Sequence, residues 1–395
     1  MKLQINRTEF MKYWQIAERC ISSKSSITAL TGVLVKAESE GGENKVRLEA
    51  TDLKTSVKCI SAGALAEEEG EAVLPVKTVG ELIKKAPSNI FTLSVKEGKG
   101  LIISGRNRYR FTTYPAKEFP TLPMSENASF FCSTSVSELL KAVTEGTVAS
   151  TAGEEFPKYL GACFFQLAGG ELRIVSTDGL RLSLSRFLPA ETGEDREFLL
   201  PVTGIRELQR LLSSLPDDTP VRIAAESTLV FFQMGSIEFS VRRVEAQFPA
   251  YEKFLEGNKT TSLEADRTEL NAALERIEII VRDFNKAVVM DLSPGGDLSL
   301  SGRAPETGEA DEVMGAVIDG EPLKTAFRTS FLIDGLKSLH SDRALLNFNG
   351  AGAHMIMQRP GDDNFIYLVM PMKLSEPESS FSEDGGGEED FSPEE

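Results

Sequence analysis

The sequence is poor in the residues that most catalytic and metal sites use. It has two histidines, His340 and His354, at no metal-ligand spacing from each other or from a cysteine. No C-x-x-C pair occurs among its four cysteines, which are Cys20, Cys59, Cys132 and Cys163. We therefore expect reduced thiols in a cytoplasmic protein that holds no metal and no cofactor.

Nucleotide-binding and nucleophile motifs are also missing. The chain has no G-x-x-x-x-G-K-[ST] loop, no G-x-G-x-x-G after a strand and no G-x-S-x-G turn. No apolar run approaches the roughly 20 residues that cross a bilayer. The opening MKLQINRTEF lacks the apolar segment of a signal peptide. These absences argue against an enzyme, a membrane protein and a secreted protein.

Basic residues are outnumbered by acidic ones, so the formal net charge of the chain is −17. The last 21 residues contain nine Asp or Glu and no Lys or Arg, which leaves −8 for the rest of the chain. An acidic total argues against nucleic-acid binding over the whole surface, but it permits a local basic face. The composition of residues 375–395 predicts a disordered, solvated tail.

Short landmarks recur at a fixed distance along the chain. The pair Thr51-Asp52 returns as Thr177-Asp178, 126 residues later, and an L-P-V triplet recurs at the same distance. An F-P pair recurs 129 residues apart. A residue that occupies the same place in two copies belongs to the framework more often than to one active site. We therefore interpret Asp178 as a turn residue whose carboxylate bonds the backbone.

Periodicity predicts three repeats of helices and strands. Apolar residues three and four apart predict amphipathic helices over residues 8–21, 76–86, 136–148, 203–215, 268–281 and 329–339. Alternating apolar residues between them predict short strands. Helices packed on one face of antiparallel sheets make an α+β fold. We expect three domains and a tail, at residues 1–123, 124–252, 253–374 and 375–395.

Several segments carry a family likeness. They are TDGLRLSL, LLPVTGIRELQRLL, SVRRVEAQFPAYEKFL and YLVMPMKL, preceded by MKLQINRTEFMKYW, LEATDLKTSV and SGRNRYRFTTYPAKEFPTL. In this order and spacing, the sequence resembles the bacterial DNA polymerase III beta subunit, the sliding clamp, from Met1 to about Leu374. The resemblance implies the DNA clamp fold, in which two chains of three clamp domains close head to tail. Antiparallel sheets form the outer wall, and helices line a hole that holds duplex DNA.

The resemblance also implies partners and sites. A clamp is opened by an ATP-driven loader and tethers the replicative polymerase and other proteins with a clamp-binding motif, without reacting itself. DNA contacts are expected from Lys12, Arg19, Lys24, Lys84, Lys141, Lys158, Tyr159, Arg206, Arg210, Arg276 and Arg282. The partner-peptide groove between the second and third domains is expected at Leu160, Thr177, Gly179, Leu182, Pro249, Phe254, Phe331, Val369, Met370, Pro371 and Met372. The dimer interface is expected at Arg106, Arg108, Tyr109, Phe111, Ile279 and Ile280.

Two other functions stay open from the residues alone. One is a scaffold that binds proteins and never encloses DNA. The other is a β-rich hydrolase or transferase that uses scattered carboxylates, against which the missing nucleophile and base motifs speak.

Overall fold

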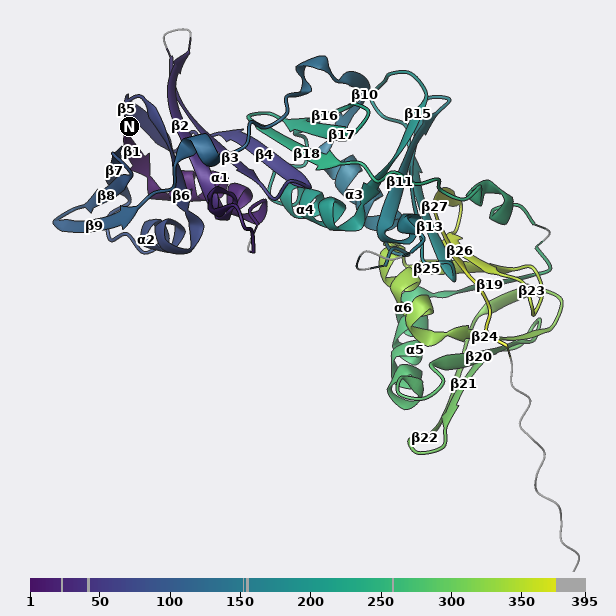
Figure 1. Cartoon of the computed structure of the whole chain (residues 1–395). Coiled ribbons are helices and arrows are strands. Elements are labelled where there is room, and N and C mark those ends of the chain that lie inside the picture. Colours follow the sequence, from purple (N-terminus) through teal and green to yellow (C-terminus); the bar gives the residue numbers. More distant parts are fainter. Residues whose placement is uncertain (23, 41–42, 152, 154–155, 258, 374–395) are drawn as a thin grey trace, which may run out of the picture.

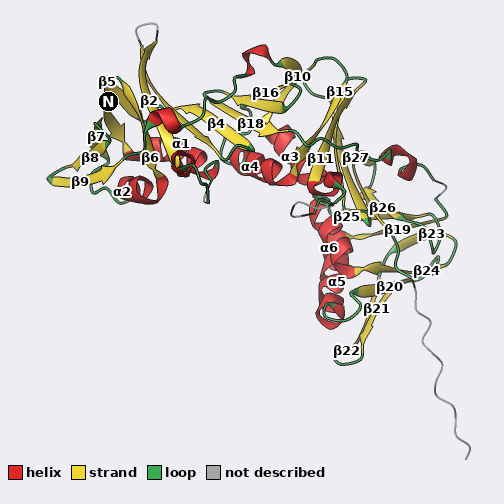
Figure 2. Cartoon of the chain, viewed as in Figure 1, coloured by secondary structure: helices red, strands yellow, loops and turns green. Residues whose placement is uncertain are grey.

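Three consecutive units form a crescent, with sheets along its outer side and helices along its inner side (Figure 1 and Figure 2). The computed structural model describes residues 1–22, 24–40, 43–151, 153, 156–257 and 259–373. The predicted tail at residues 375–395 therefore lies outside the described residues. No helix in the described ranges is long and apolar enough to cross a membrane.

Each unit has the same order of elements: one strand, a helix, five strands, a second helix and three strands. The first unit contains β1 (Lys2–Asn6), α1 (Arg7–Arg19), β2 (Gly32–Glu40), β3 (Glu43–Thr51), β4 (Thr55–Ile60), β5 (Ala64–Glu68), β6 (Gly70–Pro75), a π-helical turn (Val76–Gly80), α2 (Glu81–Lys84), β7 (Ile90–Lys96), β8 (Lys99–Ser104) and β9 (Asn107–Thr112). The second contains β10 (Ser129–Ser135), α3 (Val136–Gly146), β11 (Ala162–Ala168), β12 (Glu171–Thr177), β13 (Arg181–Phe187), β14 (Glu191–Thr192), β15 (Arg196–Pro201), α4 (Val202–Leu212), β16 (Pro220–Ala225), β17 (Leu229–Met234) and β18 (Ile237–Arg242). The third contains β19 (Thr261–Asp266), α5 (Arg267–Val281), β20 (Ala287–Leu292), β21 (Leu298–Ala304), β22 (Gly308–Met314), β23 (Val317–Gly320), β24 (Leu323–Arg328), α6 (Thr329–Ser338), β25 (Arg343–Phe348), β26 (Met355–Arg359) and β27 (Asp362–Val369).

Strand pairing crosses from one unit to the next. β18 pairs antiparallel with β4 in a sheet ordered β14-β10-β16-β17-β18-β4-β3-β2-β6. β27 pairs in the same way with β13 in a sheet ordered β15-β11-β12-β13-β27-β26-β25-β19-β23. The other two sheets, β5-β1-β7-β8-β9 and β22-β21-β20-β24, end at β9 and β22. In the described part of the chain, no strand pairs with the outer edge of β9 or of β22.

Helix starts are specified by local hydrogen bonds. At α3, the Ser135 side chain accepts from the backbone N–H of Glu138, whose carboxylate accepts from the N–H of Ser135. Asn6 and Asp266 cap α1 and α5 with their side-chain oxygens. The apolar face of each of these helices packs on its sheet, and Trp14 is fully buried.

Small apolar clusters also form on the outer face of the sheets, beneath the segments that link the units. Phe119 of the first linker packs with Leu34 and Val73. Phe248 of the second linker stacks on Phe164, with ring centroids 4.9 Å apart. Each linker is thereby anchored to the sheet that it crosses.

Candidate functional site

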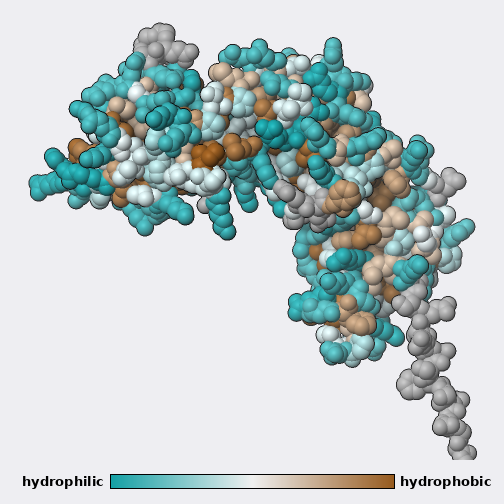
Figure 3. All heavy atoms as spheres, viewed as in Figure 1, coloured by the Kyte–Doolittle hydropathy of each residue, from teal (hydrophilic) through white to brown (hydrophobic). Residues whose placement is uncertain are grey.

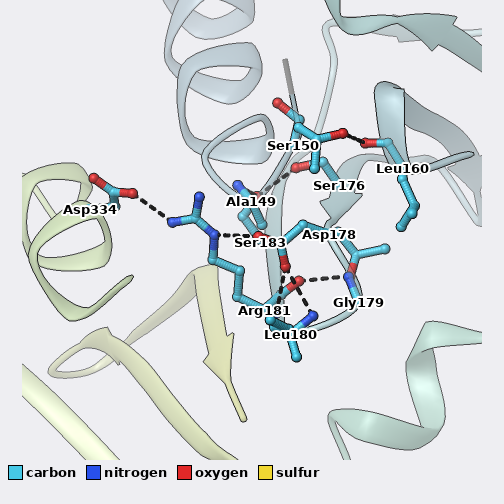
Figure 4. A network of polar contacts seen from close by, with 12 residues as sticks. Ala149, Ser150, Leu160, Ser176, Asp178, Gly179, Leu180, Arg181, Ser183 and Asp334 are labelled. Atoms are coloured by element: carbon cyan, nitrogen blue, oxygen red, sulfur yellow. Dashed lines mark hydrogen bonds and ion pairs between the residues drawn. The ribbon is translucent and has the colours of Figure 1, made fainter. Parts of the chain in front are cut away.

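The turn after β12 is built by the side chains of Thr177 and Asp178, and Figure 4 shows Asp178 beside Gly179, Leu180 and Arg181. Asp178 Oδ1 accepts from the backbone N–H groups of Leu180 and Arg181, both at 3.0 Å. Thr177 Oγ1 donates to the Arg181 carbonyl at 2.7 Å. Gly179 has φ +86°, which a side chain would strain. The carboxylate of Asp178 is therefore used by the turn, as its repetition predicted.

The first unit builds the same turn after β3. Asp52 Oδ1 accepts from the N–H of Lys54 at 2.9 Å and also from the N–H of Thr55. Thr51 Oγ1 donates to the Thr55 carbonyl at 2.8 Å. Leu53 takes the place of Gly179 with φ +72° and is about half exposed. These bonds confirm that the two T-D pairs are one framework feature.

Arg181 connects the turn in the second unit to the third unit. Its Nε donates to Asp178 at 2.9 Å, and its Nη1 donates to Asp334 on α6 at 2.6 Å. Its Nη1 also donates to the Tyr367 hydroxyl at 3.0 Å, and its guanidinium lies 4.2 Å from the ring centroid of Phe331. Burial works against its charged form, but the hydroxyl and the two carboxylates raise the pKa of Arg181. The arginine therefore stays charged and fixes the turn against α6.

The predicted groove residues divide between the two faces of the sheet that joins the second and third units. Leu182 belongs to the outer-face cluster with Phe248 and Tyr251. Phe331 and Val369 instead belong to the core of the third unit on the helix side. In the single chain these two side chains therefore lie on the other side of the sheet from Leu182, because successive residues of a strand face opposite sides and the ring of Phe331 is covered by Arg181. Their part in the groove stays a prediction.

The outer face also supplies a candidate groove residue that the sequence reasoning missed. Leu368 pairs in register with Leu182 and lies in the same outer-face cluster. Alternation along β27 places Leu368 and Met370 on one side and Val369 on the other. This alternation was the signal that could have identified Leu368.

Exposed apolar side chains surround the outer-face cluster. Phe254 is 49% exposed, Met370 39% and Leu180 53%. The N–H of Met370 donates to the Leu180 carbonyl at 2.9 Å, so these two rim residues are neighbours. Leu160, Pro249, Pro371 and Met372 are half-buried. On the face in Figure 3, brown apolar patches gather mainly at the junctions between units.

Three arginines gather between α1 and α4 on the inner side of the crescent. Arg19, Arg206 and Arg210 line one open basin, whose other lining residues are Gln209, Ser213 and Ser214. Arg19 Nη1 donates to the Arg210 carbonyl at 3.3 Å. Such a basin can bind a phosphate through charge-assisted hydrogen bonds without contacting a base.

Several predicted DNA contacts are already paired with carboxylates. The pairs are Lys12–Glu9 at 2.9 Å, Arg282–Asp283 at 3.4 Å and, within the basin, Arg210–Glu207. The neighbouring carboxylates therefore partly neutralise these cations. The remaining predicted cations Lys24, Lys84, Lys141 and Lys158 are exposed.

Two predicted DNA contacts lie elsewhere in the structure. Tyr159 packs edge-to-face on Phe248, with centroids 6.0 Å apart, so its ring belongs to the outer-face cluster. Arg276 Nε donates at 2.6 Å to Glu312 on the edge strand β22. Tyr159 is therefore partly buried in the outer-face cluster and Arg276 lies beside β22, and their contacts with DNA stay predictions.

The joint between the second and third units contains a buried ion pair that sequence reasoning missed. Arg359 Nη1 donates at 2.8 Å to Glu145, whose side chain is 1% exposed. Ser185 donates to the other oxygen of Glu145 at 2.8 Å, and Arg359 Nε donates to Asp362 at 2.6 Å. Burial opposes the charged guanidinium, but Glu145 and Asp362 raise the pKa of Arg359. The pair ties α3 to β26.

Three family models match the chain in order. The N-terminal, central and C-terminal domains of the DNA polymerase III beta subunit match residues 1–123, 135–250 and 253–373. The beta sliding clamp of Vibrio cholerae is 27% identical over 380 residues, and that of Escherichia coli is 25% identical over 375 residues. Both matches cover 95% of this chain and 100% of the relative.

Solved structures match over the same length. The DNA polymerase III beta subunit of Thermotoga maritima superposes with a TM-score of 0.86 at 26% identity. A sliding clamp of Pseudomonas aeruginosa bound to griselimycin superposes with a TM-score of 0.88, also at 26% identity. Each match covers 95% of this chain and 100% of the other.

Proposed function

Because the chain belongs to the DNA polymerase III beta subunit family, we propose that two copies close head to tail into a ring that encircles duplex DNA. The ring tethers the replicative polymerase and other proteins that carry a clamp-binding motif, after a clamp loader has opened it. It acts by enclosure in the cytoplasm and catalyses nothing. Domain boundaries at residues 123/124 and 252/253 fit the linkers that cross the outer faces.

One observation carries this proposal. Strand pairing joins each unit to the next, and the corresponding edge strands at the two ends of the crescent, β9 and β22, pair with no further strand in the described part of the chain. β4 and β13 pair with the last strands of the following units. β22 holds the same position in the third unit, and β9 is the last strand of the first. Pairing β22 with β9 of a second chain would repeat the internal joint, and two such contacts would close a ring.

The internal joints also supply a register for this contact. Lys58 on β4 lies opposite Glu238, the second residue of β18. The corresponding residue of β22 is Asp311, and the second residue of β9 is Arg108. Antiparallel pairing then sets Asp311 opposite Arg108 and Glu309 opposite Arg110 of the partner subunit. Oppositely charged cross-strand pairs favour this register.

The predicted contacts of Tyr109 agree with the same repeat. Its counterpart Phe239 lies beside Ile16 and Cys20 at the end of α1, where the first two units meet. The end of α5 carries Ile279, which is 58% exposed in the single chain, and Ile280. We propose that Tyr109 of the partner subunit covers them.

The test of the whole function is topological. We expect protein that a clamp loader has placed on nicked circular DNA to be retained there and to be lost when that DNA is linearised, because a ring can leave only over an end. Loss from both forms, or retention on both, would contradict enclosure. A protein-only scaffold would show no retention on either.

The arginine basin should supply much of the attraction to DNA. Substituting Arg19, Arg206 and Arg210 by Ser should weaken DNA association, and the salt slope should fall by roughly one for each phosphate that is no longer bound. The matched control removes three exposed cations from other surfaces, at Lys117, Arg222 and Lys324. An equal weakening in the control would show that only net charge matters.

The exposed rim of the groove should bind an apolar ligand. Griselimycin, the ligand of the Pseudomonas aeruginosa clamp, is a suitable probe for calorimetry. We expect Met370→Ala to weaken its binding at least several-fold, because exposed apolar anchors dominate such sites. Val369→Ala faces the opposite side and is the comparison, with dimerisation measured for both. Unchanged affinity in Met370→Ala would place the ligand elsewhere.

A further inference from the structure

The two linkers between units follow the same track across the outer face. The first begins where the N–H of Tyr114 donates to the Val73 carbonyl on β6 at 2.9 Å. It ends beyond β4, where Lys58 Nζ donates to the Pro123 carbonyl at 2.8 Å. The second begins where the N–H of Val244 donates to Leu199 on β15 at 2.8 Å. Each linker therefore crosses its own sheet from the far edge to the joint.

The chain enters a third copy of this track after β27. The N–H of Met372 donates to the Ala326 carbonyl on β24 at 2.7 Å. Ala326 pairs with Val289, just as Val73 pairs with Leu34 in the first unit. Leu34 is buried beneath its linker, whereas Val289 is only half-buried. The third track is therefore entered by the chain and left partly open.

This third track leads to the proposed ring joint. From Met372 it crosses β24, β20, β21 and β22, which at about 5 Å per strand is roughly 20 Å. Residues 374–395 follow directly, and an extended chain of that length reaches up to about 70 Å. The segment is therefore long enough to cross its own sheet and reach β9 of the partner subunit.

The charges at the end of the track are complementary to this segment. Arg106, Arg108 and Arg110 make no ion pair within the described ranges of the chain. In the ring, the outward carboxylates of β22 facing them are Asp311 and Glu309, and Glu309 already lies 3.5 Å from Arg303. Cations therefore exceed carboxylates at the joint, and residues 375–395 bring nine Asp or Glu with no Lys or Arg.

We propose that residues 374–395 dock along the outer face of β24, β20, β21 and β22 and place their carboxylates on Arg106 and its neighbours in the partner subunit, as an electrostatic latch across the ring joint. This inference rests on the proposed ring. A docked segment differs from the solvated tail that composition alone predicts.

The test compares the full chain with a chain truncated after Leu374. We expect truncation to raise the dimer dissociation constant about tenfold near 50 mM salt, and by less than about twofold near 0.5 M, because screening shortens the reach of these charges. A full-length chain with the nine tail carboxylates changed to amides should match the truncated one. Arg106→Ser should abolish the effect of truncation, since Arg106 precedes the residues of β9 that pair with β22. Lys117→Ser removes an exposed charge elsewhere on the first unit and should preserve it.

The outcomes separate the latch from the ring itself. If the full chain is monomeric at micromolar concentration, the proposed ring is contradicted, and the latch is contradicted with it. If dimers form but truncation leaves their affinity unchanged or increases it, only the latch is overturned. A truncation effect that persists in Arg106→Ser would overturn this docking surface. Tighter griselimycin binding on truncation, without a change in dimer affinity, would place the segment in the groove instead.

Discussion

Reversing the charge of β22 should abolish the dimer. In Glu309→Arg/Asp311→Arg, two arginines would face Arg110 and Arg108 of the partner subunit in the register set by the internal joints. Like charges brought together at an interface cost several kcal/mol. We therefore expect the dissociation constant to rise at least about a hundredfold, so that sedimentation at micromolar concentration detects monomers.

The decisive control restores the charge pairing. A chain that also carries Arg108→Asp and Arg110→Glu restores an oppositely charged pair at positions 311/108 and 309/110 of both ring joints, and it should dimerise again. Asp319→Arg/Glu321→Arg makes the same change in charge on exposed residues of the same unit, away from β22, and should remain dimeric. Failure of the exchanged chain to recover, with its fold intact, would show that β22 meets β9 in another register or not at all.

Repetition and periodicity made most of the fold predictable. The α+β class with three repeated clamp domains is confirmed, because apolar residues at helical spacing marked α1, α3, α4, α5 and α6 to within a few residues. The second helix of the first unit was also expected, but it begins with a π-helical turn at Val76–Gly80. No local signal distinguishes that turn from an ordinary helix start.

The sites were less predictable because they depend on faces and on distant partners. Asp178 was correctly interpreted as a turn residue, since its bonds run to its own neighbours. Val369 was carried over from the family motif, and its side chain lies in the core of the third unit, so its role in the groove stays a prediction. Glu145 and Arg359 are 214 residues apart. Neither sequence neighbourhood indicates that they meet, because their contact exists only once β27 has paired with β13.

That buried pair leads to the largest expected loss of stability. Arg359→Met removes the guanidinium and leaves Glu145 as a buried carboxylate whose remaining partner is Ser185. Removing one member of a buried ion pair costs about 3–5 kcal/mol. We expect that loss at neutral pH in the free energy of unfolding by urea. Arg186→Met is the matched control: Arg186 lies 3.8 Å from the exposed Asp363, and losing such a surface pair costs about 1 kcal/mol or less.

A double variant identifies the cause of the loss in Arg359→Met. The wild-type chain should itself lose stability in acid, through Asp362. Although burial opposes its charged form, the N–H of Asn364 and the guanidinium of Arg359 lower the pKa of Asp362. The contribution of Asp362 to the stability of the folded chain is therefore fully present above the pKa of an unfolded Asp, near 3.9, and is lost as the pH falls further. Glu145→Gln together with Arg359→Met should recover most of the stability at neutral pH, because no buried charge remains. A double variant that is as unstable as Arg359→Met would attribute the loss to packing rather than to charge.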